Sequence, residues 1–157
     1  MDGVRTAGVG DVAGMVALSE RYRRRLETYQ PVFWRRAPDS AEAQTRFFTT
    51  LLERADALAL VHLAFAGLAG FLIATLREAP PVYAPGGLTC SIDDFCMAED
   101  RYWPKAGTAL LGEAMRWARE HGAVQVVVAA PHRDQPKLTL LAAEGLSAAS
   151  EWHTRAL

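Results

Sequence analysis

The sequence has few cysteines, no excess of either charge and no long hydrophobic run, and each shortage excludes a class of protein. The two cysteines, Cys90 and Cys96, have a spacing that fits neither a zinc knuckle nor a redox pair. If both lie on one strand, their even separation puts them on the same face, too far apart to form a disulfide easily. We interpret them as free thiols, which suit a reducing compartment.

Charge and hydropathy exclude two further classes. The net charge of −1 lacks the basic excess that is typical of proteins that bind nucleic acids. We interpret the charged stretch at residues 20–27 (ERYRRRLE) as the solvated face of a helix. No apolar run approaches the length that crosses a membrane, and the N-terminus lacks a charged-then-apolar leader. These absences predict a cytoplasmic protein without nucleic-acid or membrane partners.

The residues that are present fit a single folded domain over residues 1–157. Half of the chain is hydrophobic (50%) and 22% is charged, which is ordinary for a globular protein with a sizeable core. No internal repeat, low-complexity tract or linker divides the chain. The cysteine spacing also leaves no metal site to expect.

Hydrophobic spacing predicts a mixture of strands and helices. The expected strands are residues 4–6, 57–65, 69–76, 88–97, 123–130 and 152–157. The expected helices run from a cap at Asp11 to about residue 26, from a cap at Asp39 or Ser40 to about residue 52, over residues 107–121, and from Pro136 to near Gly145. Gly67 supplies the tight turn between the second and third strands. Residues 29–38, 78–87 and 99–105 are expected to be loops.

The best local candidate for a binding site is the start of the helix at Gly107. The first amides of a helix are unpaired and carry partial positive charge, so they attract anions. A glycine there lets a phosphate approach the backbone. The amides would come from Ala106, Gly107, Thr108 and Ala109, with the Lys105 ammonium at the rim. The alternative interpretation is a turn of small residues that only starts a helix.

The surroundings of Gly107 resemble the coenzyme A signature of the GNAT acetyltransferase superfamily. That signature has Gln or Arg, a glycine three positions later, and a glycine or alanine two positions after that. This chain has Tyr102, Lys105 and Gly107 at those positions, so only the last one matches. Four other stretches resemble GNAT elements in the correct order: residues 66–71 (AGLAGF), 91–97 (SIDDFCM), 116–128 (RWAREHGAVQVVV) and 140–146 (LLAAEGL).

The resemblance implies an α/β (α+β) fold with a mixed, mostly antiparallel central sheet of about six or seven strands, flanked by about four helices. It also implies that the fourth and fifth strands splay apart to admit acetyl-CoA. The pantetheine arm would pair with backbone near Phe95, Cys96 and Met97, in the way a strand adds to a sheet. The phosphates would rest on the amides that follow Lys105.

The activity that the resemblance implies is direct acetyl transfer to an amine. Asp93 and Asp94 are the candidate general bases, because a carboxylate in a partly apolar cleft can have a raised pKa. The alternative is that either aspartate only attracts a cationic substrate or lies in solvent. Neighbours on a strand point to opposite faces, so at most one of the two aspartates should face the acceptor. Both faces of the strand carry apolar residues, so the alternation does not show which aspartate it is. The family's usual acid, a tyrosine, corresponds to Leu141 here. The family's nearby asparagine corresponds to Asp134, or to His132 if the loop shifts.

The acceptor would be a small-molecule or peptide amine. Its pocket is predicted around Tyr29, Phe33 and Trp34 in the first inter-helix loop, with Tyr83 closing over the same cleft. The alternative is that these aromatic residues pin the loop to the core. Three functions stay open: an acetyl-CoA-dependent N-acetyltransferase, a non-catalytic GNAT-like module that binds acyl-CoA or another ligand, and a partner protein that dimerises through its last strand. The last alternative rests on the tendency of exposed edge strands to pair.

Overall fold

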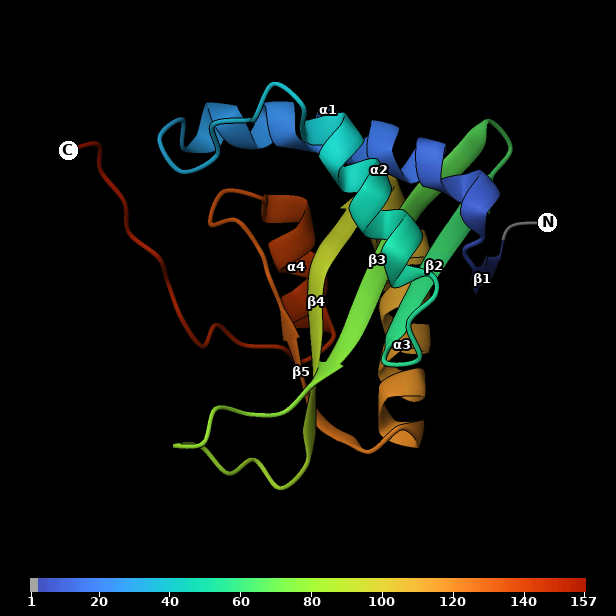
Figure 1. Ribbon diagram of the computed structural model, residues 1–157, viewed down its shortest axis with the longest axis vertical. Coiled ribbons are helices and arrows are strands. Elements are labelled where there is room, and N and C mark those ends of the chain that lie inside the picture. The colour runs from blue at the N-terminus through green and yellow to red at the C-terminus, as the bar shows by residue number, and fades with distance from the viewer. Residues whose placement is uncertain (1–2) are drawn as a thin grey trace.

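A computed structural model of the protein describes residues 3–157 (Figure 1). Its strands are β1 (Val4–Thr6), β2 (Ala57–Ala64), β3 (Gly67–Arg77), β4 (Leu88–Met97) and β5 (Ala123–Val128). Its α-helices are α1 (Val12–Tyr29), α2 (Ser40–Leu51), α3 (Thr108–Glu120) and α4 (Gln135–Ala143). These bounds confirm all four predicted helices and five of the six predicted strands. None of the helices in the described part of the chain is long and apolar enough to cross a membrane.

The strands form one sheet in the order β1-β2-β3-β4-β5. Neighbouring strands are antiparallel except for β4 and β5, which run parallel because α3 carries the chain from one to the other. Gly67 has a φ of 123° at the β2–β3 turn, which explains why a glycine is needed there. The sheet is mixed and mostly antiparallel, as the resemblance implied, but it has five strands in the described chain rather than six or seven.

The missing strand is the one predicted at residues 152–157. That segment is extended but pairs with no strand of the described chain, and the Trp152 side chain is 82% exposed. Figure 1 shows the segment leaving α4 and running outside β5 toward the end of α1. Its one aromatic contact is between Trp152 and Phe33, whose ring centroids lie 5.8 Å apart. A strand pattern alone is not enough, because a strand also needs a neighbouring strand to pair with, and residues 152–157 have none in the described chain.

Two apolar cores cover the two faces of the sheet. The first lies between the sheet and helices α3 and α4, and includes Phe95, Trp103 and Leu110. The second lies under α1 and α2, and includes Met15, Phe48 and Phe71. Each core therefore fixes a helix pair against one face, which holds the sheet between two layers (Figure 1).

A β-bulge in β4 changes which face each residue of that strand occupies. Ile73 pairs with Asp94 but Thr75 pairs with Ser91, so Ile92 and Asp93 together oppose the one residue between. Cys90 consequently packs in the core beside α3, whereas Cys96 packs in the core beside α1. The expectation that the two cysteines share a face is wrong, because the extra residue shifts the alternation between them. Both thiols are free and buried.

Candidate functional site

The sheet opens between β4 and β5, immediately after the bulge. Their parallel ladder ends where Ile92 pairs with Val128, and the last bond joins the Ala129 amide to the Ile92 carbonyl at 2.9 Å. Residues 93–97 of β4 have no strand partner on this side in the described chain. The splay that the resemblance implied is therefore present.

The open side of β4 offers backbone groups that a ligand can pair with. The Ala98 amide donates to the Ala69 carbonyl of β3, and the β3–β4 register continues unbroken through Phe71 opposite Cys96. In an antiparallel ladder alternate residues face the partner strand, so Cys96 directs its backbone groups to β3. Phe95 and Met97 direct theirs to the open side. Of the three backbone positions predicted to pair with a ligand, these two are free to do so.

The turn before Gly107 does not have the form that the sequence predicts. Residues 99–105 were expected to be a loop, but a 3₁₀ turn at Asp100–Tyr102 and a π-helical turn at Trp103–Gly107 lead directly into α3. The Thr108 amide donates to the Trp103 carbonyl. The first turn of this continuous helical segment therefore lies at Asp100, and the helix does not begin at Gly107 with a set of free amides.

Packing explains Gly107 without a phosphate. A β-carbon at this position would lie 3.0 Å from both Leu140 Cδ2 and Trp103 Cε3. Gly107 and Ala106 are buried, whereas Lys105 and Ala109 are exposed and Thr108 lies between these extremes. The five residues predicted to cradle phosphates therefore differ in burial, and their role stays a prediction. The packing of Gly107 also fits the alternative interpretation, a small-residue turn that starts a helix.

Asp93 and Asp94 line the same shallow hollow, on the side of the sheet that α2 covers. The bulge explains why neighbouring residues share a face, and it corrects the expectation that at most one of them does. Asp93 pairs with Arg77 at 3.0 Å, and both side chains are more than half exposed. The two carboxylates thus share a site but differ in environment.

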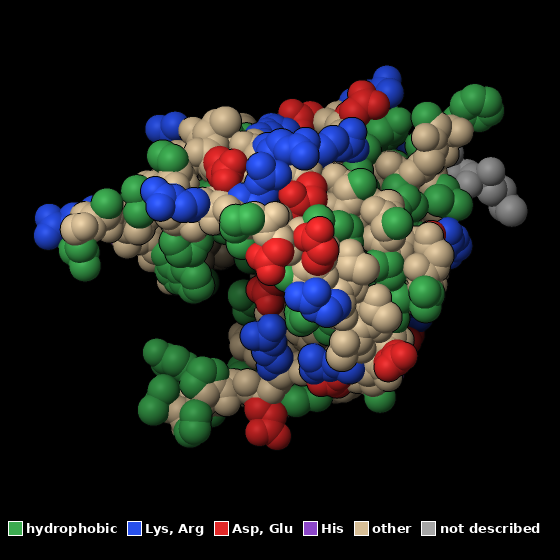
Figure 2. Space-filling view, turned by 45° about the horizontal axis from the view of Figure 1, so that its top comes forward, with side chains coloured by type: hydrophobic (Ala, Val, Ile, Leu, Met, Phe, Trp, Pro, Cys, Tyr) green, Lys and Arg blue, Asp and Glu red, His purple; other side chains and the backbone are tan. Residues whose placement is uncertain are grey.

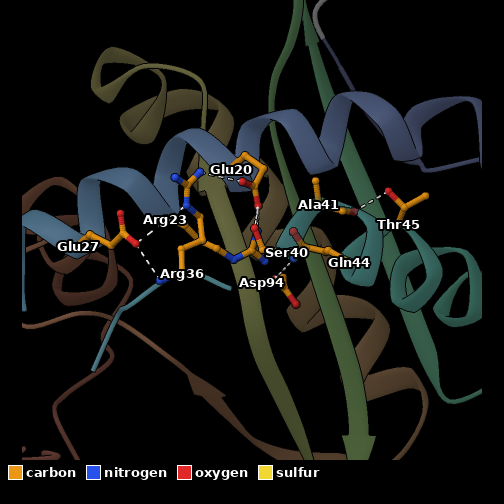
Figure 3. A network of polar contacts seen from close by, with 9 residues as sticks. All are labelled: Glu20, Arg23, Glu27, Arg36, Ser40, Ala41, Gln44, Thr45 and Asp94. Atoms are coloured by element: carbon orange, nitrogen blue, oxygen red, sulfur yellow. Dashed lines mark hydrogen bonds and ion pairs between the residues drawn. The ribbon is translucent and has the colours of Figure 1, made fainter. Parts of the chain in front are cut away.

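Asp94 is the less solvated carboxylate of the pair. Burial raises its pKa, and the nearby Asp93 carboxylate adds to the effect, whereas the Arg23 guanidinium opposes it. The Gln44 side-chain amide donates to Asp94 Oδ1 at 3.2 Å (Figure 3). Gln44 itself is only 7% exposed, and its Oε1 atom accepts no hydrogen bond in the described chain. A buried unpaired acceptor beside a carboxylate favours a ligand that brings N–H donors.

The position of Gln44 follows from how α2 is attached to α1. Glu20 of α1 accepts hydrogen bonds from Ser40 Oγ at 2.7 Å and from Arg36 at 3.0 Å, where α2 begins (Figure 3). Glu27 accepts from the Arg36 amide at 2.7 Å. This network fixes the first turn of α2, and Gln44, one turn further along the helix, reaches β4.

Lys137 is the central residue that the sequence analysis did not identify. It lies on α4, it is 1% exposed, and its Nζ atom lies 3.4 Å from the Ala129 carbonyl oxygen, at the point where β5 leaves β4. Asp134, also 1% exposed, accepts a hydrogen bond from the Tyr22 hydroxyl and caps α4 through the Lys137 amide. The sequence did contain a signal for this residue. Lys137 follows Asp134 by three positions in an otherwise apolar helix, and a lysine in such a helix is buried only when it has a partner.

Comparison with known proteins identifies the fold. No protein-family model matches the chain, and no curated protein matches it in sequence. Solved structures do match. A tetramutant of a Bacillus halodurans protein has a TM-score of 0.81 at 14% identity, over 98% of this chain and 99% of the other. A predicted acetyltransferase with acetyl-CoA from Clostridium acetobutylicum has a TM-score of 0.71 at 18% identity, over 99% of this chain and 96% of the other. An aminoglycoside 6'-N-acetyltransferase from Acinetobacter baumannii has a TM-score of 0.71 at 14% identity, over 100% of this chain and 99% of the other.

The fold is that of the GNAT acetyltransferases. The resemblance seen in the sequence is thereby confirmed at the level of the fold. In GNAT terms, the opening beside Phe95 lies between the fourth and fifth strands, and Lys137 and Leu141 are one turn apart on the helix that follows.

The residues predicted to form the acceptor pocket of this GNAT fold do not gather in one place. Phe33 and Trp34 pack edge to face, with ring centroids 4.6 Å apart, and the Tyr29 hydroxyl accepts from Arg25 at 2.6 Å. Tyr83 is 71% exposed in the 78–87 loop. Figure 1 places the two loops at opposite ends of the sheet, so Tyr83 does not close over the other three aromatic residues.

Proposed function

We propose that the protein is an N-acetyltransferase that transfers an acetyl group from acetyl-CoA to a small-molecule or peptide amine. The observation that carries the proposal is the opening between β4 and β5, with the backbone of Phe95 and Met97 directed into it. Acetyl-CoA, when bound, supplies the activated thioester. Strand-like pairing of its amide-bearing arm with these two residues would orient it along β4.

The acceptor site of this proposal is the hollow at Asp93 and Asp94. The two carboxylates would attract a cationic amine, and the Gln44 side-chain amide, which donates to Asp94 Oδ1, would hold that carboxylate beside the hollow. An amine must lose a proton before it attacks a thioester carbonyl, and Asp94, with its raised pKa, is the better matched base. The new C–N bond replaces the C–S bond, and the thiolate leaves with a proton from solvent.

A covalent intermediate on cysteine is not part of the proposal. Burial raises the pKa of the Cys96 thiol to about 12, so the thiolate that a nucleophile requires is scarce at neutral pH. Cys96 also packs in the core beside α1, where it is buried. These two facts favour direct transfer from thioester to amine.

The test is turnover measured together with binding. We expect calorimetry to detect acetyl-CoA binding, and a thiol-release assay with a panel of primary amines to detect free coenzyme A. We expect Asp94→Asn to lower kcat by about 100-fold or more, as loss of a general base does, with a much smaller effect for Asp93→Asn. Absence of thiol release with all amines, at saturating acetyl-CoA, would exclude transfer.

A second candidate function is a GNAT-shaped module that binds a ligand without turnover. Two observations favour it: the coenzyme signature is altered at Tyr102 and Lys105, and the family's tyrosine position holds Leu141, which is buried and has no proton to give. The same experiment separates the two functions, because the module predicts binding without release of thiol.

A further inference from the structure

A buried ammonium group lies in the opening between β4 and β5. Lys137 Nζ lies 3.4 Å from the Ala129 carbonyl oxygen and 3.4 Å from the Tyr22 hydroxyl oxygen. Ala129 is the residue at which β5 stops pairing with β4, so its carbonyl is the acceptor that the next rung of the ladder would have used. The lysine side chain thus occupies the first position beyond the ladder.

Three aromatic rings surround the same ammonium. Its nitrogen lies 5.1 Å from the ring centroid of Tyr22, 5.7 Å from that of Phe95 and 5.7 Å from that of Trp103. These distances are within the range of cation–π attraction, which strengthens when the cation is desolvated. The rings come from α1, from β4 and from the turn before α3, so the lysine is enclosed from several elements.

Tyr22 and Asp134 hold the ammonium in place. Tyr22 belongs to α1, on one side of the sheet, and donates its hydroxyl hydrogen to Asp134 at the start of α4, on the other side. Burial lowers the pKa of Lys137, but the carboxylates of Asp134 and Asp94 and the Cys96 thiol oppose that effect. The opening is consequently bridged by a polar group whose charge is compensated from both layers.

We infer that Lys137 controls ligand access to this opening. Its side chain fills the space that the amide-bearing arm of a ligand would occupy, and its ammonium binds the Ala129 carbonyl that the arm would otherwise pair with. The inference rests on the proposed function for the identity of the probe, acetyl-CoA. It explains why the free backbone of Phe95 and Met97 lies beside a closed core rather than an open channel. A ligand that enters must displace the lysine, whereas a shorter residue would leave the way open.

The test compares two variants that separate volume from charge. Lys137→Ala shortens the side chain, and Lys137→Met keeps most of its length without the ammonium. We expect calorimetry with acetyl-CoA to show at least tenfold tighter binding by Lys137→Ala than by the wild-type protein, and wild-type-like or weaker binding by Lys137→Met. Equal affinity in the wild-type protein and Lys137→Ala would overturn the inference, as would an absence of binding by both.

These outcomes distinguish the inference from the proposed function. Tight binding and turnover by the wild-type protein, unchanged in Lys137→Ala, would support the function and refute the role of Lys137. Binding by Lys137→Ala alone would support the role of Lys137 and refute acetyl transfer by the wild-type protein.

Folding of the alanine variant needs its own control, because removing a buried charge leaves Asp134 uncompensated. Circular dichroism melting checks that the variant is folded. If it is not, hydrogen–deuterium exchange of the wild-type protein at saturating acetyl-CoA replaces it. Displacement of Lys137 should then deprotect the amides of α4 at least severalfold. Unchanged or increased protection of α4 upon binding would contradict the inference.

Discussion

At the scale of single residues, the buried carboxylate of Asp94 is expected to cost stability. Its pKa is raised in the folded state, mainly by burial, so the folded protein binds more protons than the unfolded chain between pH 3.8 and the raised value. The free energy of unfolding therefore falls as pH rises through that window. Above that pH range Asp94 is ionised in both states, and the free energy of unfolding is lowered by the full penalty of burying the charge.

Asp94→Asn should remove that cost. We expect its melting temperature to exceed that of the wild-type protein at pH 7, and the difference to vanish below about pH 3.8, where both states of the wild-type chain are protonated. Asp93→Asn is the matched control, because Asp93 makes an exposed ion pair with Arg77, which is worth about 0–1 kcal/mol. A variant less stable than wild type at pH 7 would show that the carboxylate is favourably held.

Gly107 supports a second prediction at this scale. If it cradled a phosphate, a larger side chain would spoil binding and leave the fold intact. The contacts at 3.0 Å with Leu140 and Trp103 predict instead that Gly107→Val lowers the free energy of unfolding by about 1–3 kcal/mol. Gly112→Val is the control on the exposed side of α3, where a β-carbon meets nothing within 4 Å. Equal stability of the two variants, measured by urea unfolding, would contradict the packing explanation.

At the scale of elements, the sequence predicted what depends on local pattern. Helix α3 was predictable from its apolar stripe and from Gly122, which follows it with a φ of 85°. Strand β4 was predictable over its whole length. The bulge within β4 was not predictable. It depends on Thr75 of β3 pairing with Ser91 of β4 in space, and no turn residue in the sequence marks it. The shared hollow of Asp93 and Asp94 follows from that bulge.

Only part of the candidate site could be predicted, because the rest depends on contacts in space. The free backbone of Phe95 and Met97 follows from the strand order that the family resemblance implied. The helical path through Trp103–Gly107 does not follow from the sequence: Pro104 discourages helix before it, but the burial of Trp103 against Phe95, with ring centroids 4.9 Å apart, stabilises the π-helical turn. Lys137 itself carried a sequence signal, but its partners could not be predicted, because Tyr22 lies far from it in sequence and Ala129 lies outside its helix.

At the scale of the whole molecule, one side of the protein is hollowed (Figure 2), and β5 is an edge strand of the sheet. Figure 2 shows this notch, with hydrophobic side chains on both rims: the end of α1 and its following loop on one side, and the 78–87 loop on the other. The exposed apolar side chains on the two rims include Val32, Phe33, Val82 and Tyr83, and further ones lie on β5 (Val124, Val127) and in the C-terminal segment (Trp152). An exposed edge strand beside apolar rims invites pairing with another chain.

We propose that the homodimer, which the sequence leaves open as one alternative, would place a second copy in this notch, with its unpaired C-terminal segment beside β5. Val127 is half exposed on β5, and Val127→Lys puts a charge where the second copy would pack. We expect sedimentation equilibrium to give a dimer for the wild-type protein and at least a tenfold larger dissociation constant for Val127→Lys. Phe65→Lys is the matched control: Phe65 is fully exposed at the β2–β3 turn, away from β5, so its dimer should be unchanged. A wild-type monomer at high concentration would refute the dimer, and equal weakening by both variants would place the contact elsewhere, because a charge at the hairpin turn cannot disturb pairing along β5.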